Sequence, residues 1–463
     1  MSTPQEQAEQ LFAQSSADIQ AGQFETAEAR LVEALDKAPQ LAEAHANLAW
    51  LLERRGSVDD ALHHYELAID LQPDNARIHL NLGALLAQLK FFLAAEAAYR
   101  RALVVDASLP GIWSNLGALL AQIGRDDEAE ESLRTALRLD PEHAGAHFNL
   151  ACLLLRKGRY PEGWRHLEFR DWYRPIEQRL RCVRWCGQPL AGLSVLLVYE
   201  AGHGDLIQFC RYVPVLRQAG AARVDVLCHP ALKELLRTLD GVGDVFAFDE
   251  NRFEHDWDYW VPALSLAHHL GTELETIPAA LPYLRAPAPK LAHWRQKLDG
   301  LGPRPGRRVG FVWHGNPDFE NDAQRSLPGL QTLAPLWQVP GVQFFSLQKG
   351  RGEKDVLRLQ GSQPLIDLAA DLHNFADTAA AIEQLDLVIS VDTAVAHLAG
   401  ALGKPCWVLL PGFLPDWRWL EDRSDSPWYP GVLRLFRQPR GADWAPVIQA
   451  VCEALQEARQ SNV

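Results

Sequence analysis

A polar cluster follows an apolar run late in the chain. The run "LDLVI" (385–389) predicts a buried strand, and the small residues of "SVDTAVAHLAGALGKP" (390–405) predict a helix. Backbone N–H groups at a helix start bind phosphate well, and the small residues after Thr393 leave them open. Asp392 would repel a diphosphate, so we expect it to hold a sugar hydroxyl or to cap the helix. His397 lies one turn further, although a histidine in such a helix is more often a packed residue.

A second polar segment, "EAGHGDLIQF" (200–209), follows the apolar run "SVLLVYE". Gly202 and Gly204 allow a tight turn and the close approach of a ligand to the backbone. Asp205 stands where the next helix is predicted to begin. Aspartate is a good N-cap, and a carboxylate at such a position can also take a proton from an attacking hydroxyl as a general base. The residues alone leave both roles open.

Two more polar segments follow predicted strands. Arg325 is the only Lys or Arg in the long loop "WHGNPDFENDAQRSLP" (313–328), and a fixed guanidinium suits a phosphate. Gln348 and Lys349 follow the strand predicted at 342–348. The alternatives are a surface arginine for Arg325 and a solvated loop lysine for Lys349.

The elements that position these residues alternate in type from residue 194 onward. Short aliphatic or β-branched runs alternate with helical stretches, which predicts parallel sheets flanked by helices. Strands are predicted at 194–200, 223–228, 307–315, 342–348 and 404–411. They form two lobes, 194–287 and 288–463, preceded by a linker at 172–193, and the C-terminal stretch predicts an amphipathic helix that could pack back across the lobes. Ligands bind at the carboxyl ends of strands in such sheets, so the expected site is a cleft between the lobes.

The first 171 residues repeat with a period of 34. Alanines recur at 27, 61, 95 and 129, and glycines recur at 22, 56, 124 and 158, with Lys90 as the exception in the glycine register. Small residues at fixed offsets let antiparallel helices pack closely. This pattern resembles the tetratricopeptide repeat family and predicts an all-α solenoid over residues 1–171.

A third register places an asparagine in the first helix of successive repeats, at Asn47, Asn81, Asn115 and Asn149. A column of side-chain amides can donate to and accept from an extended peptide backbone without reading its sequence. The column resembles the asparagine ladder in the repeat domain of O-GlcNAc transferases, which implies an acceptor protein or peptide in the solenoid groove. The alternative is that each asparagine bonds within its own solenoid.

Composition excludes several function classes. The net charge of −14 argues against nonspecific binding to nucleic acid or to an anionic membrane. The seven cysteines form no CxxC pair and no zinc-site spacing, so we expect them to be reduced and mostly buried. A polar, acidic N-terminus without a signal peptide and no run of about 18 apolar residues predict a cytoplasmic protein without a membrane span.

Together, "GxGD", the loop ending in "RSLP" and "DTAVAHLAGALGKP" resemble the heptosyltransferase-related glycosyltransferases, over about residues 185–445. The resemblance implies a GT-B fold of two Rossmann-like lobes. It also implies inverting transfer of a sugar from a nucleotide-diphosphate donor, without a metal ion or other cofactor. The predicted fold class is therefore an N-terminal all-α solenoid followed by an α/β GT-B domain. No Asp-x-Asp motif occupies the cleft-facing positions expected for a metal-dependent transferase.

The resemblance also assigns roles by position. Asp205 would be the catalytic base, and Arg325, three residues before Pro328, would bind phosphate. The backbone amides of Thr393 and Ala394, together with His397, would bind the diphosphate of the donor. Asp392 would bind the sugar or the ribose. Gln348 or Lys349 would approach the nucleoside.

Two features of the sequence leave open which donor or acceptor the site prefers. The subfamily with tetratricopeptide repeats usually has "EQGLGD" where this chain has "EAGHGD", so Ala201 and His203 are departures. The segment "DWRWLEDRSDSPWYP" (416–430) also resembles this subfamily. Its aromatic residues could stack on a sugar or base, or could equally pack between the lobes.

Three functions remain consistent with these observations. The leading hypothesis is a protein glycosyltransferase whose solenoid delivers a Ser or Thr hydroxyl to the cleft. The second is transfer to a polysaccharide or lipid-linked glycan, with the repeats binding partner enzymes. The third is an inactive scaffold that binds a nucleotide sugar and a protein partner. The sequence leaves the oligomeric state open, with a homo-oligomer as one alternative because solenoid edges often pair.

Overall fold

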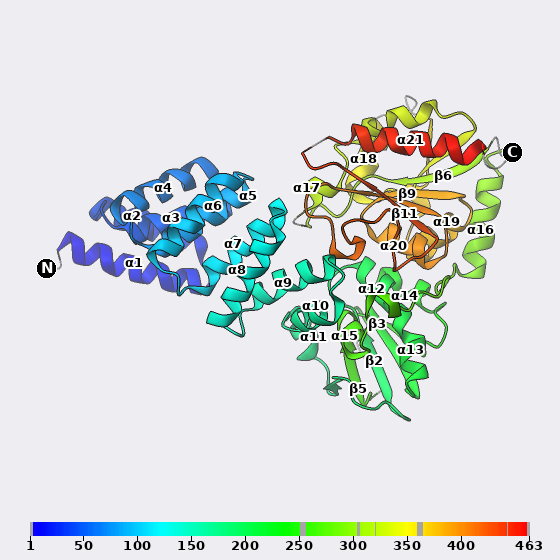
Figure 1. Cartoon of the computed structure of the whole chain (residues 1–463), viewed down its shortest axis with the longest axis horizontal. Helices are drawn as coiled ribbons and strands as arrows, with labels where there is room; N and C mark the ends of the chain where they lie inside the picture. The colour runs from blue at the N-terminus through cyan, green and yellow to red at the C-terminus, as the bar shows by residue number, and fades with distance from the viewer. Residues whose placement is uncertain are drawn as a thin grey trace. The chain divides into compact units, whose positions relative to one another are not determined.

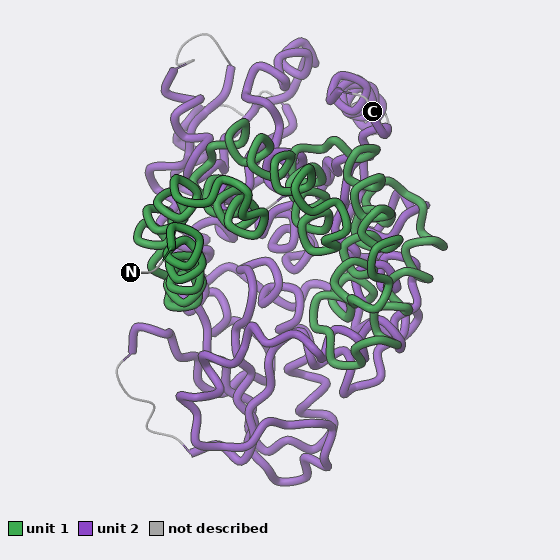
Figure 2. Tube along the Cα trace, turned by 90° about the vertical axis from the view of Figure 1, so that its left-hand side faces the viewer, with its two compact units in different colours: residues 1–150 green, residues 151–463 purple. Residues whose placement is uncertain are grey.

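The computed structural model of the chain describes residues 3–250, 256–302, 306–319, 321–358, 364–441 and 443–460. The chain divides into two compact units, Met1–Leu150 and Ala151–Val463 (Figure 2). The first contains paired helices, and the second contains two parallel sheets. The predicted domain limits at 171, 193 and 287 stay predictions.

Unit 1 is built from helices that pack in successive pairs, as the 34-residue repeat predicts. The helices are α1 (Pro4–Gln20), α2 (Phe24–Lys37), α3 (Ala42–Arg55), α4 (Val58–Leu71), α5 (Ala76–Gln88), α6 (Phe92–Val105), α7 (Pro110–Ile123), α8 (Asp126–Leu139) and the first part of α9 (Ala144–Arg156) (Figure 1). The alanines of the repeat, at 27, 61, 95 and 129, are completely buried. Their lack of a longer side chain lets the paired helices approach closely.

The glycine register marks the turn inside each repeat. Gly22, Gly56, Gly124 and Gly158 all have a left-handed backbone, with φ between 74° and 86°. Lys90 occupies the same register and has the same conformation, at φ 64°. The turn therefore imposes the left-handed conformation even where the residue carries a Cβ atom, at an energetic cost that glycine avoids.

A further register, which the sequence analysis did not identify, ties the first helix of a repeat to the preceding turn. In each case a ring nitrogen lies within hydrogen-bonding distance of the carbonyl oxygen six residues earlier. The pairs are His45 with Pro39 (3.0 Å), His79 with Pro73 (2.8 Å), Trp113 with Ala107 (2.9 Å) and His147 with Pro141 (2.8 Å). Because the carbonyl can only accept, the histidine nitrogens must carry a proton on this side.

Unit 2 begins with the last part of α9, continues through α10 (Tyr160–Leu167) and α11 (Arg174–Glu177), and then forms an N-terminal lobe. The strands of this lobe form a parallel sheet in the order β1-β5-β2-β3-β4. They are β1 (Val183–Arg184), β2 (Ser194–Val198), β3 (Arg223–Cys228), β4 (Val245–Ala247) and β5 (Tyr259–Pro262). The helices of this lobe are α12 (His203–Phe209), α13 (Val213–Gln218), α14 (Pro230–Leu236) and α15 (Leu266–His269). The segment predicted as a linker thus supplies strand β1 at the sheet edge.

The C-terminal lobe holds a second parallel sheet, in the order β11-β10-β9-β6-β7-β8. Its strands are β6 (Arg307–Val312), β7 (Val342–Ser346), β8 (Leu365–Asp367), β9 (Leu387–Val391), β10 (Cys406–Leu410) and β11 (Leu433–Arg437). Its helices are α16 (Ala288–Asp299), α17 (Asp322–Arg325), α18 (Glu353–Arg358), α19 (Phe375–Glu383), α20 (Ala394–Ala401) and α21 (Ala445–Gln460). Two parallel α/β lobes in tandem agree with the predicted GT-B fold.

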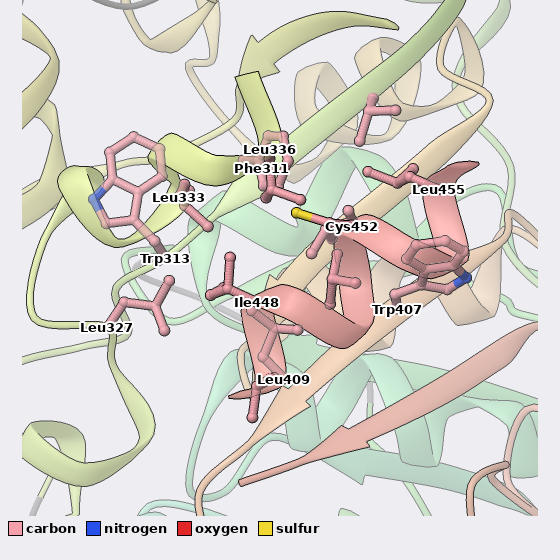
Figure 3. Packing of buried hydrophobic residues seen from close by; sticks show 14 of the residues in the cluster. Phe311, Trp313, Leu327, Leu333, Leu336, Trp407, Leu409, Ile448, Cys452 and Leu455 are labelled. Carbon is pink, nitrogen blue, oxygen red and sulfur yellow. The ribbon is translucent and has the colours of Figure 1, made fainter. Parts of the chain in front are cut away.

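The C-terminal helix packs on its own lobe, and the packing across both lobes that the sequence left open is not seen for the described residues. Helix α21 buries Ile448, Cys452 and Leu455 in a cluster with Phe311, Trp407 and other residues of its own lobe (Figure 3). The physical reason is that the sheet of this lobe presents a large apolar face, and the amphipathic helix covers it.

All seven cysteines are free thiols, and Cys210, Cys228, Cys406 and Cys452 are buried. Cys186 is exposed. In the parts of the chain that are described, no helix has both the length and the apolar character needed to cross a bilayer.

Candidate active site

The starts of two helices, one from each lobe, meet in unit 2. Helix α12 follows strand β2, helix α20 follows strand β9, and the two helices lie side by side (Figure 1). Gly204 makes this approach feasible: an added Cβ would lie 2.9 Å from Cδ2 of His397 and 3.4 Å from Cα of Ala394. The carboxyl ends of both sheets thereby converge, as expected for a ligand site in such folds.

Asp205 lies in the first turn of α12, but it is not the N-cap. Gly202 is the N-cap, and Oδ2 of Asp205 accepts a hydrogen bond from the Gly202 N–H at 2.7 Å. The other carboxylate oxygen, Oδ1, pairs with Nη2 of Arg418 from the C-terminal lobe. Burial raises the pKa of Asp205, and Arg418 and the Gly202 N–H act against this rise.

Arg418 is a residue of this site that sequence reasoning missed. It lies in the segment 416–430, in the short 3-10 helix η7 (Trp417–Trp419), and its side chain is 8% exposed. Besides Asp205, it contacts both carboxylate oxygens of Asp416, at 3.0 and 2.9 Å. The motif "DWRW" carries one signal that could have revealed it: a cation between two tryptophans is often buried and paired.

Asp392 and Thr393 form the turn between β9 and α20. Thr393 is the N-cap of α20, and its hydroxyl lies 2.9 Å from the Ser390 hydroxyl instead of bonding to the first turn of the helix. Asp392 is half-buried, and burial together with the neighbouring Asp416 raises its pKa to about 6. Arg325 and Arg418 are close enough to act in the opposite direction.

His397 is packed and neutral. Its ring stacks on Trp419 with centroids 5.2 Å apart, and Nδ1 lies 3.0 Å from the hydroxyl of Tyr429. Burial and then Arg418 and Arg211 hold the pKa of His397 well below its usual value. His397 is therefore a packed residue, as histidines in such helices often are. Its ring also contacts Gly204.

Arg325 lies at the end of α17 on the loop predicted to bind phosphate. Its guanidinium lies 4.3 Å from the Phe319 ring centroid, and Nε is 3.2 Å from Oδ1 of Asp322. The side chain is 16% exposed, so it is held against the lobe and still reaches solvent. Through its effect on the pKa of Asp392, it belongs to the same electrostatic group as the α20 turn.

Gln348 and Lys349 do not share these contacts. The Gln348 amide oxygen accepts from the backbone N–H groups of Trp313 and His314, both at 2.9 Å, and its nitrogen donates to backbone carbonyls. Gln348 is thus fully bonded in shaping the loop after β6. The Lys349 ammonium donates to the Ala369 carbonyl at 2.9 Å and pairs with Glu353 at 3.5 Å. Approach of either residue to a nucleoside stays a prediction.

The two departures in "EAGHGD" have distinct environments. Ala201 has a left-handed backbone, with φ of 56°. His203 opens α12, where Nδ1 lies 3.0 Å from the Tyr199 hydroxyl and the ring lies 4.5 Å from that of His229. Phe375 of the C-terminal lobe packs edge-on against it. Burial, with a smaller effect of His229, lowers the pKa of His203 to about 4.

The aromatic residues of segment 416–430 are packed inside unit 2. Trp417, Trp419, Trp428 and Tyr429 are all buried. Trp428 contacts Phe209 of α12 and donates to the Tyr160 hydroxyl of α10 at 3.1 Å. Arg211 crosses the same boundary and donates to the Trp428 carbonyl. Of the two interpretations that the sequence left open, interlobe packing describes Trp428 and Tyr429, which contact Phe209 or Arg211, whereas Trp419 stacks on His397 of its own lobe.

The asparagine column lies on the helices predicted for it: Asn47 on α3, Asn81 on α5, Asn115 on α7 and Asn149 on α9. Each is half-buried. Asn115 is close enough to the Tyr99 hydroxyl of α6 to act towards a lower pKa of that hydroxyl, while burial raises it. Binding of a peptide by the column stays a prediction.

The structure thus brings Asp205, Asp392, His397 and Arg325 into one group around the starts of α12 and α20, in which Arg418 pairs with Asp205 and acts electrostatically on Asp392. Among the described residues, His, Cys, Asp and Glu side chains form no group of three or more that could hold a metal ion.

Comparison with known families and proteins agrees with this organisation. Residues 52–90 match a TPR repeat model, residues 114–163 match a tetratricopeptide repeat model, and residues 332–409 match the model of glycosyltransferase family 9 (heptosyltransferase). The chain is 29% identical over 332 residues to protein FlbA of Caulobacter vibrioides. The match covers 64% of this chain and 52% of FlbA, so the chain spans about half the length of that relative.

Solved structures similar to the chain include PilF of Pseudomonas aeruginosa, at 23% identity and a TM-score of 0.34, covering 38% of this chain and 87% of PilF. A thermophilic TPR protein of Thermus thermophilus is 22% identical with a TM-score of 0.32, covering 37% of this chain and 91% of its own. The family matches thus show similarity to tetratricopeptide repeats in the N-terminal part of the chain and to glycosyltransferase family 9 (heptosyltransferase) in residues 332–409.

Proposed function

We propose that this protein is an inverting glycosyltransferase that moves a sugar from a nucleotide-diphosphate donor to a hydroxyl of a polypeptide acceptor. The family 9 match supports glycosyl transfer in general. The observation that carries the finer proposal is the contact between α12 and α20, which places the Asp205 carboxylate in one electrostatic group with the α20 turn. A base and an anion-binding helix start are the two parts that such a reaction needs.

The reaction would run in a single displacement. The acceptor hydroxyl oxygen attacks the anomeric carbon of the donor and forms the new glycosidic bond, while its proton moves to the Asp205 carboxylate. The bond from the anomeric carbon to the diphosphate oxygen breaks, and the nucleoside diphosphate leaves with the electron pair. Each oxygen of Asp205 keeps a lone pair beyond the one used by Gly202 or Arg418, so the proton has a place to go.

Charge on the leaving diphosphate would be stabilised by the chain itself. The N–H groups at the start of α20 and the Arg325 guanidinium would receive it, which is the role that a metal ion takes in other transferases. The asparagine column of unit 1 would hold the acceptor polypeptide, in line with the binding surfaces that repeat solenoids present.

The first test is donor turnover. The full chain is incubated with UDP-, GDP- and dTDP-linked sugars, with and without lysate of its own host, and release of nucleoside diphosphate is measured. We expect release from one donor that increases with lysate and is lost in Asp205→Asn. The matched control is Asp240→Asn, an exposed aspartate paired with Arg285, which should leave release unchanged. Nucleotide binding without release from any donor would favour an inactive scaffold.

A second candidate function is transfer to a polysaccharide or lipid-linked glycan. The Asn115 amide acts on the Tyr99 hydroxyl and tends to lower its pKa, so part of its hydrogen-bonding capacity is directed into the solenoid, which favours this candidate. The combined variant Asn47→Ala and Asn81→Ala separates the two candidates. Loss of lysate-dependent transfer, with donor hydrolysis retained, supports a polypeptide acceptor; unchanged transfer supports a glycan acceptor.

A further inference from the structure

The Arg418 guanidinium reaches from the C-terminal lobe to the N-terminal lobe and is fully engaged. Nη2 pairs with Asp205, Nη1 contacts both oxygens of Asp416, and Nε donates to the Gln208 side-chain oxygen at 2.5 Å. Asp205 and Gln208 lie on α12, 213 and 210 residues away in sequence. A planar guanidinium with several fixed donors suits such a bridge better than an ammonium group does.

The segment that carries Arg418 holds it in this geometry. The Asp416 carboxylate accepts the Arg418 backbone N–H at 2.9 Å, and the guanidinium lies 4.2 Å from the Trp417 ring centroid. Leu420, two residues on, has φ of 54° and ψ of −171°, a conformation that is costly for a residue with a side chain. The surrounding contacts therefore fix the guanidinium before any substrate binds.

The charges that face Asp205 come from several elements. Arg418 and Asp416 approach from the C-terminal lobe, while Tyr199 and Glu200 approach from the loop after β2. Glu200 is paired with the buried Arg170 at 2.8 Å, which offsets its charge. On the side of α20, His397 is neutral, and Asp392 acts on Arg418. Arg418 is the only cation among the largest influences on the pKa of Asp205.

We infer that Arg418 is a positioning residue for the transfer step: it holds the Asp205 carboxylate ionised and oriented across the lobe boundary, ready to accept the hydroxyl proton. The inference rests on the proposed function of Asp205. When the proton arrives, Asp205 becomes a neutral carboxylic acid and its ion pair with Arg418 is lost, while Asp416 keeps the guanidinium in place.

The test uses charge changes of opposite sign around one carboxylate. In Arg418→Gln the cation is removed, so the pKa of Asp205 should rise by about 1–3 units. In Asp416→Asn a repelling charge is removed, so the pKa of Asp205 should fall. Arg418→Lys keeps the positive charge, so the pKa of Asp205 in this variant should stay close to its value in the wild type. Arg423→Gln is the matched control, because Arg423 and Asp425 form a more exposed pair on the same segment.

Two readouts separate this inference from the proposed function. The first is ¹³C NMR titration of the full chain labelled at aspartate Cγ, with the Asp205 signal assigned by its loss in Asp205→Asn. The second is the pH dependence of kcat for release of nucleoside diphosphate. We expect the Asp205 titration and the acid limb of kcat to move up in Arg418→Gln and down in Asp416→Asn.

The outcomes are distinct. If the carboxyl titration moves as expected while no donor is turned over, the proposed function fails and the ion-pair role of Arg418 holds as a property of the fold. If Arg418→Gln loses turnover while the NMR titration of Asp205 stays in place, or keeps turnover with an unmoved acid limb, Arg418 acts only as a packing residue and the inference is overturned. Unfolding curves of each variant at pH 7 identify loss of activity through loss of the fold.

Discussion

Gly204 of the N-terminal lobe lies directly against His397 of the C-terminal lobe, so that a Cβ atom at position 204 would come within 2.9 Å of Cδ2 of the imidazole. The sequence suggested that this glycine permits close approach of a ligand to the backbone. The structure gives it another task, because the approaching group is helix α20. Gly204 has no left-handed backbone, so the requirement is for space and not for an unusual conformation.

Gly204→Ala is therefore expected to destabilise the chain by about 1–3 kcal/mol, as overpacking of a close contact does. The His397 ring cannot easily move, since it is stacked on Trp419 and bonded to Tyr429. Urea unfolding followed by tryptophan fluorescence measures the loss. Gly111→Ala, in helix α7, is the control, because its nearest neighbour would be Leu80 at an ordinary 3.8 Å. Equal stability of the two variants would contradict the account of Gly204.

His203→Leu is expected to reduce the loss of stability in acid. The folded chain holds His203 neutral, with its pKa lowered to about 4, whereas in the unfolded chain the pKa lies near 6.5. Between these values the unfolded state binds more protons, so the contribution of this residue is present above about pH 6.5 and is lost as the pH falls towards 4. Leucine cannot bind a proton, so the variant should not lose the roughly 1–3 kcal/mol of unfolding free energy that protonation of His203 costs the wild type in acid. Urea unfolding at pH 5 and pH 7.5 gives the difference, and an unchanged difference would refute it.

Asp392→Asn is expected to have the opposite pH dependence. Burial and Asp416 raise the pKa of Asp392 to about 6, above its ordinary value of 3.8. Between these values the folded state binds more protons, so the ionised carboxyl lowers stability as the pH rises from about 4 to 6. Asparagine carries no charge, and the variant should gain about 1–3 kcal/mol over the wild type at pH 7.5 and little at pH 4. A gain at pH 4 as large as that at pH 7.5 would exclude relief of a buried charge.

The same carboxylate gives a prediction for ligand binding. If a diphosphate binds at the α20 helix start, its charge repels ionised Asp392, so the affinity for UDP or GDP should increase as the pH falls from 7.5 to 5.5. Isothermal calorimetry measures the affinity at each pH. In Asp392→Asn the affinity at pH 7.5 should already approach the value for the wild type at low pH. A pH dependence that is unaffected by the substitution would place the diphosphate elsewhere.

Much of the sheet framework follows from the sequence alone. Strand β3 lies at 223–228 as predicted, because an apolar, β-branched run stands between turn residues. Strand β4, with three residues, and strand β11, "LRLFR", were not predicted, since one is very short and the other alternates with arginine. The strand in the predicted linker, β1, has two residues and exists only through its pairing with β5.

The candidate site was only partly predictable, for a physical reason. Motifs locate the ends of strands, and both Asp205 and the α20 turn follow such ends. What a motif does not contain is the partner from the other lobe. The bond from Arg418 to Asp205 spans 213 residues, and the fit of Gly204 to His397 spans a similar distance. Likewise the sequence suggested that Gln348 or Lys349 approaches a nucleoside, but it could not show that the Gln348 amide oxygen accepts from the backbone N–H groups of Trp313 and His314.

The left-handed turn at Lys90 gives a prediction that is independent of the proposed function. Lys90 has φ of 64° in a register where the other residues are glycines, and this conformation costs a residue with a Cβ atom roughly 1–2 kcal/mol. Glycine removes that strain, but a glycine loses more backbone conformational entropy on folding than a lysine does. The net effect of Lys90→Gly should therefore be to stabilise the helical repeats by about 0.5–1 kcal/mol. The reciprocal change Gly56→Lys, in the same register at φ 86°, should destabilise them. Urea unfolding followed by far-ultraviolet circular dichroism measures both variants, and shifts of the same sign would show that the turn does not impose the strain.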